Sequence, residues 1–152
     1  MLSFEIAAIL CIGLLIGVEF AVSVFINPIL WRLDESAQAD AIRLFARRLG
    51  HAMPFWYVLS LLFLLVTAWI DRHQSHLPLL ITAIAIWAAV ILVTVLVLVP
   101  INNRMMRLPA GSFTQEARQA HRRWDTLHRL RIFALGVSFV CFLAAVLIQQ
   151  CI

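Results

Sequence analysis

Glu19 stands out because it is a carboxylic acid inside a long apolar run of this 152-residue sequence. An acidic residue at the centre of a membrane-spanning helix costs roughly 2.5–3.5 kcal/mol, so it must face protein or water, be paired, or be protonated. Ser23 and Asn27 follow at i+4 and i+8, and a helix carries all three side chains on one stripe. We expect Glu19 and Asn27 to line a polar interior site. The alternative is that Glu19 only ties helices together by hydrogen bonds.

A second set of chemically capable residues precedes the last apolar run. At 100° per residue, one face of a helix there carries His121, Trp124, His128 and Arg131. Arg122 and Arg129 fall on the opposite side, where lipid headgroups would bind them. An imidazole can act as a base, and a guanidinium can stabilise an anion. The face is predicted to turn inward, although interfacial anchoring of its side chains is the alternative.

Further polar residues lie at the expected starts and ends of other apolar runs. His51 precedes a run that opens with Pro54, and Asn102 follows Pro100. His51 is an interface residue or a ligand, and Asn102 caps a helix or holds a ligand. These residues share one half of the expected bundle with Glu19, whereas His73 and His76 lie in the opposite turn and are expected to be solvated.

The possible cofactors follow from the same residues. Carboxylate and imidazole ligands suit iron, manganese or zinc, so a single divalent metal bound jointly by Glu19, His51 and His128 is one hypothesis. The other is that the protein uses no cofactor. Nothing in the sequence separates the two.

The elements that must position these side chains are membrane helices. Hydrophobic residues make up 63% of the chain and charged residues 13%, about half of the roughly 25% that a soluble protein carries. Nucleic acid is excluded as a partner, because all twelve basic residues are arginines that cluster beside apolar runs, a pattern typical of membrane orientation. The partners expected instead are the lipid bilayer, a hydrophobic small molecule and possible further copies of the chain.

Four apolar runs predict an all-α integral membrane four-helix bundle that forms a single domain, 1–152. A helix needs roughly 17–25 residues to cross the hydrocarbon core. The predicted spans cover about 4–30, 54–70, 77–99 and 132–148. Amphipathic segments precede the two short spans, and the segment 34–49 is expected to form an interfacial helix that ends at Gly50.

The arginine distribution predicts the orientation of the bundle. The connections after the first and third spans hold eleven arginines, and the connection after the second span holds only Arg72. Because loops rich in arginine stay in the cytoplasm, both termini are expected to face outward, in a multi-pass protein of a bacterial inner membrane.

An ordered set of short motifs resembles the anthrone oxygenase-like family of small four-span membrane proteins. The motifs are Asn27-Pro28, Pro100-Ile101-Asn102-Asn103 and Trp124-x-x-x-His128-x-x-Arg131, in an order and spacing that cover most of the chain. The resemblance implies an oxidoreductase. Fungal members oxidise a ring methylene of fused-ring anthrones to a quinone carbonyl with molecular oxygen.

The candidate residues have the chemistry that such a reaction needs. His128 would be the base, or Glu19 if it faces the same pocket, because a positioned base can remove the acidic benzylic proton of an anthrone. Arg131 and Asn102 would stabilise the phenolate oxygen. Trp124 and apolar helix walls would hold the flat rings, and Asn27 and His51 complete the expected substrate-binding set.

Two other classes of function remain open. A non-enzymatic accessory subunit would dock a larger membrane partner through its first helix. A transporter would use Glu19 as a proton carrier, although the outer half of the sequence offers no matching polar path.

Overall fold

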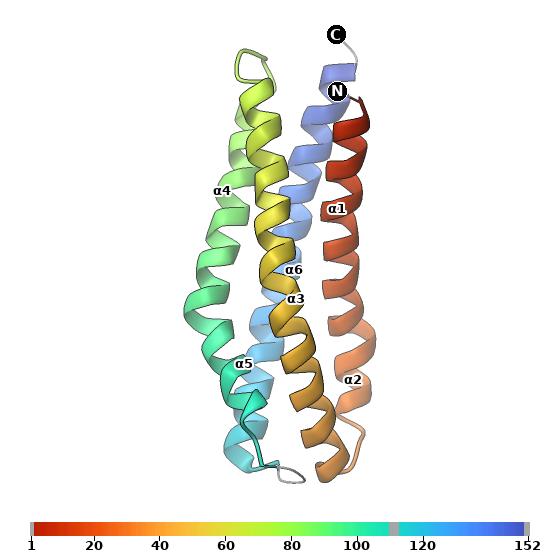
Figure 1. The fold of residues 1–152 in the computed structure, drawn as a ribbon, viewed down its shortest axis with the longest axis vertical. Helices are drawn as coiled ribbons and strands as arrows, with labels where there is room; N and C mark the ends of the chain where they lie inside the picture. The colour runs from red at the N-terminus through yellow and green to blue at the C-terminus, as the bar shows by residue number, and fades with distance from the viewer. Residues whose placement is uncertain (1, 110–112, 151–152) are drawn as a thin grey trace.

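The computed structural model describes residues 2–109 and 113–150, which form a bundle of four long helical rods (Figure 1). The first rod is α1 with η1 and α2, the second is α3, the third is α4 with η2 and α5, and the fourth is α6. In chain order their bounds are Leu2–Ala21, Val22–Ile26, Asn27–Leu30, Glu35–Ile70, Leu77–Val93, Thr94–Leu98, Val99–Met106 and Gln115–Gln150. The predicted all-α four-helix bundle is confirmed.

All four rods are long and apolar enough to cross a membrane. The candidate spans contain 28, 36, 30 and 35 residues, with mean hydropathies of 2.6, 1.9, 2.9 and 2.5. Large apolar side chains such as Phe55, Trp69 and Phe133 point outward and are more than two thirds exposed, as lipid contact requires. The chain is therefore a multi-pass membrane protein.

The antiparallel arrangement of the rods brings the two arginine-rich segments of the chain to the same end of the bundle (Figure 1). In Figure 1 both termini and the α3–α4 turn lie at one end of the bundle, which we call the terminal end. The α2–α3 connection, the end of α5 and the start of α6 lie at the opposite end, which we call the arginine-rich end. Most arginines of the chain belong to the segments around that end.

The predicted interfacial helix that ends at Gly50 is wrong, because α3 continues without a break from Glu35 to Ile70. Asp34 caps the N-terminus of this helix, because its carboxylate accepts hydrogen bonds from the amides of Ser36 and Ala37. The Ala37 amide and the Ser36 hydroxyl hold the pKa of the Asp34 carboxyl below its ordinary value.

Gly50 serves close packing rather than helix termination. A Cβ atom at this position would lie 2.9 Å from Nδ2 of Asn102, so a larger residue would have to displace the Asn102 amide from this place against α3. The same amide nitrogen of Asn102 donates to the carbonyl of Ala46 at 3.1 Å, one turn earlier in α3. The contact therefore fixes Asn102 against α3.

Two π-helical turns interrupt the first and third rods, and each has a proline as its cause. Pro28 and Pro100 lack the N–H that would continue the regular hydrogen-bond ladder. The amides just before them bond five residues back instead, from Asn27 to Val22 and from Val99 to Thr94. Such turns are frequent at functional sites, and both lie beside the polar residues described below.

Two apolar clusters stabilise the bundle, one on each side of a polar layer. The larger joins α1, α3, α4 and α6 around fully buried Trp87, Leu135 and Phe142. The smaller lies toward the arginine-rich end and contains Leu30 and Met105. In each rod, the polar residues singled out in the sequence lie between the residues of the larger cluster and those of the smaller one; examples are Glu19 in the first rod and His128 in the fourth.

His76 in the α3–α4 turn is buried, so the expectation that it is solvated is wrong. It is 3% exposed, and its Nε2 donates to Oδ2 of Asp71 at 3.2 Å. The main chain also closes this turn, because the amide of Gln74 donates to the carbonyl of Asp71. His73 is exposed, as predicted.

Candidate functional site

The site is built around the carboxylate of Glu19, which is 2% exposed. The NH2 nitrogen of Arg131 in α6 donates to its Oε2 at 2.5 Å. The hydroxyl of Tyr57 in α3 donates to its Oε1 at 3.0 Å. Three separate rods therefore supply one buried network, and Glu19 has the positive partner that a buried carboxylate requires.

His128 completes this network and uses both of its ring nitrogens within the protein. Nε2 lies 3.1 Å from the carbonyl oxygen of Glu19, which only accepts, so we assign the ring proton to Nε2. Nδ1 then accepts from the NH2 nitrogen of Arg131 at 2.7 Å. That nitrogen bridges Nδ1 and Oε2 of Glu19, which lie 3.1 Å apart. These contacts describe a neutral imidazole that orients both charged neighbours.

A cavity of about 400 Å³ lies against this network and has walls from all four rods. Glu19, Tyr57, Trp124, His128 and Arg131 line one side of it. The remaining lining is largely apolar and comes from the first, second and third rods. A volume in this range is typical of small-molecule sites, which combine apolar walls with a few placed polar groups.

Two residues that line the cavity each have a polar atom without a hydrogen-bond partner within the described part of the chain. These atoms are Nε of Arg131 and Oγ1 of Thr94, both buried. The side chain of Arg131 is 10% exposed, and Thr94 begins the π-helical turn η2. Buried polar groups are nearly always paired, so two unpaired ones in residues that line one cavity indicate a place for polar atoms of a ligand.

The aromatic ring of Trp124 forms part of the wall and is held by stacking. The rings of Trp124 and His128 are 4.6 Å apart and 13° from parallel. On its other side, the ring of His121 lies at 5.9 Å and 8°. The predicted helix face thus turns inward as a set, whereas Arg122 and Arg129 are exposed.

Asn102 and His51 lie at the edge of the cavity. Asn102 lines it while its amide is bound to the carbonyl of Ala46. His51 also lines it but is exposed, and its Nδ1 lies 2.6 Å from the carbonyl of Arg47. That carbonyl accepts the Nδ1 proton, so His51 is a residue of the rim.

The three residues considered for a metal are not brought together. Within residues 2–109 and 113–150, no three His, Cys, Asp or Glu side chains form a group that could hold a metal ion. Glu19 and His128 are adjacent, but both accept hydrogen bonds from Arg131. His51 lies apart from them at the rim of the cavity. The residues present do not fit the joint ligand set of Glu19, His51 and His128.

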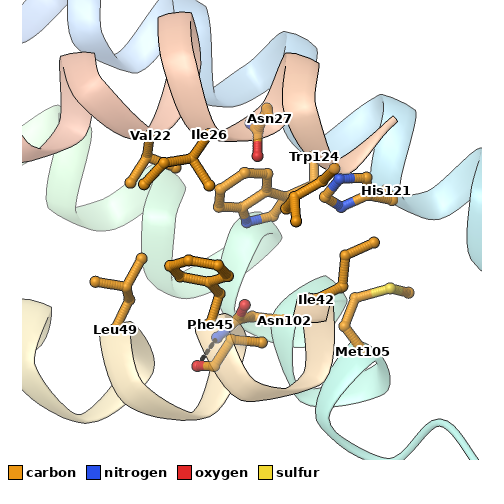
Figure 2. Close-up of a pocket in the computed structure, with 12 residues that line it drawn as sticks. Val22, Ile26, Asn27, Ile42, Phe45, Leu49, Asn102, Met105, His121 and Trp124 are labelled. Atoms are coloured by element: carbon orange, nitrogen blue, oxygen red, sulfur yellow. Dashed lines mark hydrogen bonds between the residues drawn. The ribbon is translucent and has the colours of Figure 1, made fainter. Parts of the chain in front are cut away.

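Asn27 lies in a second polar chain behind the cavity. Its Nδ2 donates to Oδ1 of Asp125 at 2.8 Å, and Oδ2 of Asp125 accepts from Arg129 at 2.7 Å. Asn27 and Asp125 are 2% and 7% exposed. Asn27 does not line the larger cavity but lines a smaller one, seen in Figure 2.

Replacement of Asp125 by alanine is expected to lower the free energy of unfolding by about 1–3 kcal/mol, because it leaves the buried Asn27 amide without an acceptor. Arg129→Ala, which removes only the exposed end of this chain, should cost about 0–1 kcal/mol. Thermal unfolding in detergent measures both. Equal losses in the two variants would contradict the role given to the Asn27 contact.

Tyr57, Thr94 and Asp125 belong to the site although the sequence did not single them out for it. Tyr57 is the one tyrosine of the chain, and its position inside an apolar run was the available signal. A threonine in an apolar helix usually donates to its own backbone, but the hydroxyl of Thr94, at the start of the π-helical turn η2, has no partner among the described residues. Asp125 lies between Arg122 and Arg129 in the sequence, and only the packing of α6 on the first rod reveals its contact with Asn27.

Comparison with known proteins identifies a family whose model covers most of the residues described above. A search of curated proteins and a search of solved structures gave no match. The family model for anthrone oxygenase matches residues 41–141, which is 101 of the 152 residues. The matched region begins in α3 and ends in α6, and it includes Tyr57, Asn102, Trp124, His128 and Arg131. The chain therefore belongs to the anthrone oxygenase family.

Proposed function

We propose that this protein is a membrane-embedded oxygenase that converts the ring methylene of a flat, phenolic, fused-ring substrate into a carbonyl with molecular oxygen. The observation that carries the proposal is the pair of Glu19 and Arg131, held side by side on the wall of a largely apolar 400 Å³ cavity. A base beside a cation is the combination that forms and stabilises a carbanion. Membership of the anthrone oxygenase family supports the same reaction class.

The cavity is suited to a substrate that arrives through lipid. Val58, Val95 and Val99 line the cavity and are also exposed on the outer surface of the bundle, by 52%, 56% and 36%. A hydrophobic molecule dissolved in the bilayer thus meets the cavity wall directly. Inside, the ring of Trp124 provides a flat face on which fused aromatic rings stack.

Glu19 is the base in this mechanism. Of the two candidates, His128 has no free ring nitrogen, because Nε2 donates to a carbonyl and Nδ1 accepts from Arg131. Each oxygen of the Glu19 carboxylate accepts one hydrogen bond from Tyr57 or Arg131 and keeps a further lone pair. Glu19 removes a proton from the methylene, while His128 positions Arg131 and the Glu19 backbone.

Arg131 stabilises the charge that proton removal creates. Loss of the methylene proton moves negative charge onto the ketone oxygen across the substrate ring. Nη2 of Arg131 is already engaged by Glu19 and His128. Its Nε–H is buried and unpaired, and we expect a small shift of the side chain on substrate binding to let it donate to that oxygen. The hydroxyl of Thr94 provides a second polar contact for the phenolic groups.

The oxygen chemistry then balances without a further reactant. The carbanion gives its electron pair to O2 and forms a carbon–oxygen bond, and the resulting peroxide anion takes back the proton from Glu19. Removal of the second methylene proton by Glu19 breaks the O–O bond and forms the carbonyl. The hydroxide released takes that proton and leaves as water. One oxygen atom is in the quinone and the other is in water.

The test is turnover of an anthrone by the purified protein in lipid nanodiscs under labelled oxygen gas. The expected result is a quinone that carries one labelled atom in its new carbonyl, formed in proportion to protein and faster than in empty nanodiscs. Arg122→Ala, which removes an exposed arginine of the same helix, should have the same rate. A rate equal to that of empty nanodiscs would overturn the proposal.

A further inference from the structure

A second, smaller cavity lies beside the one assigned to the substrate, and Figure 2 shows its lining. Its volume is about 50 Å³. Val22, Leu49, Asn102 and Trp124 line both cavities, so these side chains form a shared wall. A molecule in the small cavity is therefore separated from the larger cavity by these four side chains.

The size and chemistry of the small cavity restrict its occupant. Apart from Asn27, Asn102 and His121, its walls are apolar or aromatic, and Figure 2 shows Phe45, Ile42 and Met105 facing Trp124 and Val22 across it. One water-sized ligand needs roughly 10–15 Å³, and an apolar cavity of about 150 Å³ holds benzene or xenon. The cavity thus fits a molecule of a few heavy atoms and excludes an aromatic ring.

One residue that lines this cavity has a polar atom without a partner. Nε2 of His121 is buried without a hydrogen bond among the described residues, and the residue is 4% exposed. The ring is fixed by its stacking on Trp124 and by contact with Trp31 at 5.1 Å between ring centres. An unpaired imidazole among apolar walls suits a molecule that enters uncharged and gains negative charge as it reacts, because an Nε2–H donates to that charge.

We propose that the small cavity is the dioxygen site of the enzyme, where O2 is held against the side chains of His121 and Trp124 before it reacts with the substrate carbanion. This inference rests on the proposed oxygenase function and names a site for its second substrate. Molecular oxygen is apolar, has two heavy atoms and is the oxidant that the reaction requires. Because the two cavities share a wall, O2 has only to pass the side chains of that wall to reach the carbanion in the larger cavity.

The experiment uses xenon as the probe, because xenon binds apolar cavities of gas size whether or not the protein turns over substrate. Crystals of the wild-type protein under xenon pressure are compared with crystals of Ala46→Leu, which adds three carbon atoms to a residue of the cavity wall. Ile26→Phe fills the same cavity from the first rod. The matched control is Leu44→Phe, which enlarges an exposed side chain of α3.

Xenon is expected in the small cavity of the wild-type protein and of Leu44→Phe, and absent from Ala46→Leu and Ile26→Phe. In turnover, the KM for oxygen should rise by about tenfold in the two filled variants, while the KM for the anthrone stays unchanged. Ordered water in the cavity without xenon, or an unchanged KM for oxygen in both filled variants, would overturn this inference. Loss of turnover in the wild type together with bound xenon would instead overturn the proposed function.

Discussion

Glu19→Gln is expected to lower the rate of quinone formation by about 10²–10⁴-fold, the contribution of a positioned acid–base group. Glutamine has nearly the same volume as glutamate, and its amide oxygen keeps one of the contacts to Tyr57 or Arg131. It cannot take a proton from the methylene. Initial rates of anthrone oxidation in nanodiscs measure the change.

Binding of the quinone product separates this loss from a failure to fold. The ring of Trp124 lines the cavity, so quenching of tryptophan fluorescence reports the product, and Glu19→Gln should bind it within about threefold of the wild type. Ser23→Ala, one turn further along the same helix, should retain full activity. A wild-type rate in Glu19→Gln would exclude the carboxylate as the base.

Arg131→Ala should have the largest effect on stability. It leaves the buried carboxylate of Glu19 without its positive partner, which typically costs about 3–5 kcal/mol in the free energy of unfolding. Anthrone oxidation should also fall to the rate of empty nanodiscs, because no cation remains to stabilise the carbanion. Thermal unfolding in detergent and turnover in nanodiscs measure the two effects separately.

Two further variants divide the structural role of Arg131 from its catalytic role. Glu19→Gln combined with Arg131→Met removes both charges, so it should recover most of the lost stability and none of the activity. Arg131→Lys keeps the charge but lacks the Nε–H group, and it should be stable but slow. Full activity in Arg131→Lys would contradict the assignment of Nε to the substrate oxygen.

The sequence predicted the helical rods and the inward face of α6 because both depend on local patterns. Long apolar runs specify membrane helices, and a spacing of three or four residues specifies which side chains share a face. His128 and Arg131 therefore turned inward together, and the exposed positions of Arg122 and Arg129 followed from the same arithmetic.

Features that depend on contacts between rods were not predictable in this way. Gly50 resembles a helix end in the sequence, but it is a point of close approach to Asn102 on another rod. Tyr57 is 38 residues from Glu19 in the chain, and no local pattern links them. His76 resembles a solvated turn residue until its contact with Asp71 is seen.

The choice of the catalytic base also depends on contacts between rods that the sequence does not reveal. Residue type alone favours a histidine for proton transfer near neutral pH. The structure shows that both nitrogens of His128 are occupied, by the Glu19 carbonyl and by Arg131. Hydrogen bonds between α1 and α6, which no spacing in either segment encodes, are therefore the reason why the proposed mechanism assigns the base to Glu19 and not to His128.

The central claim is that the cavity beside Glu19 and Arg131 holds the substrate rings. The most direct measurement is a crystal structure of the protein with a dihydroxyanthraquinone, the stable product analogue. We expect its rings to lie against Trp124 and one of its oxygens to lie about 2.7–3.2 Å from Nε of Arg131. A quinone bound elsewhere on the bundle, or a cavity that stays empty at a saturating concentration, would show that this cavity is not the substrate site.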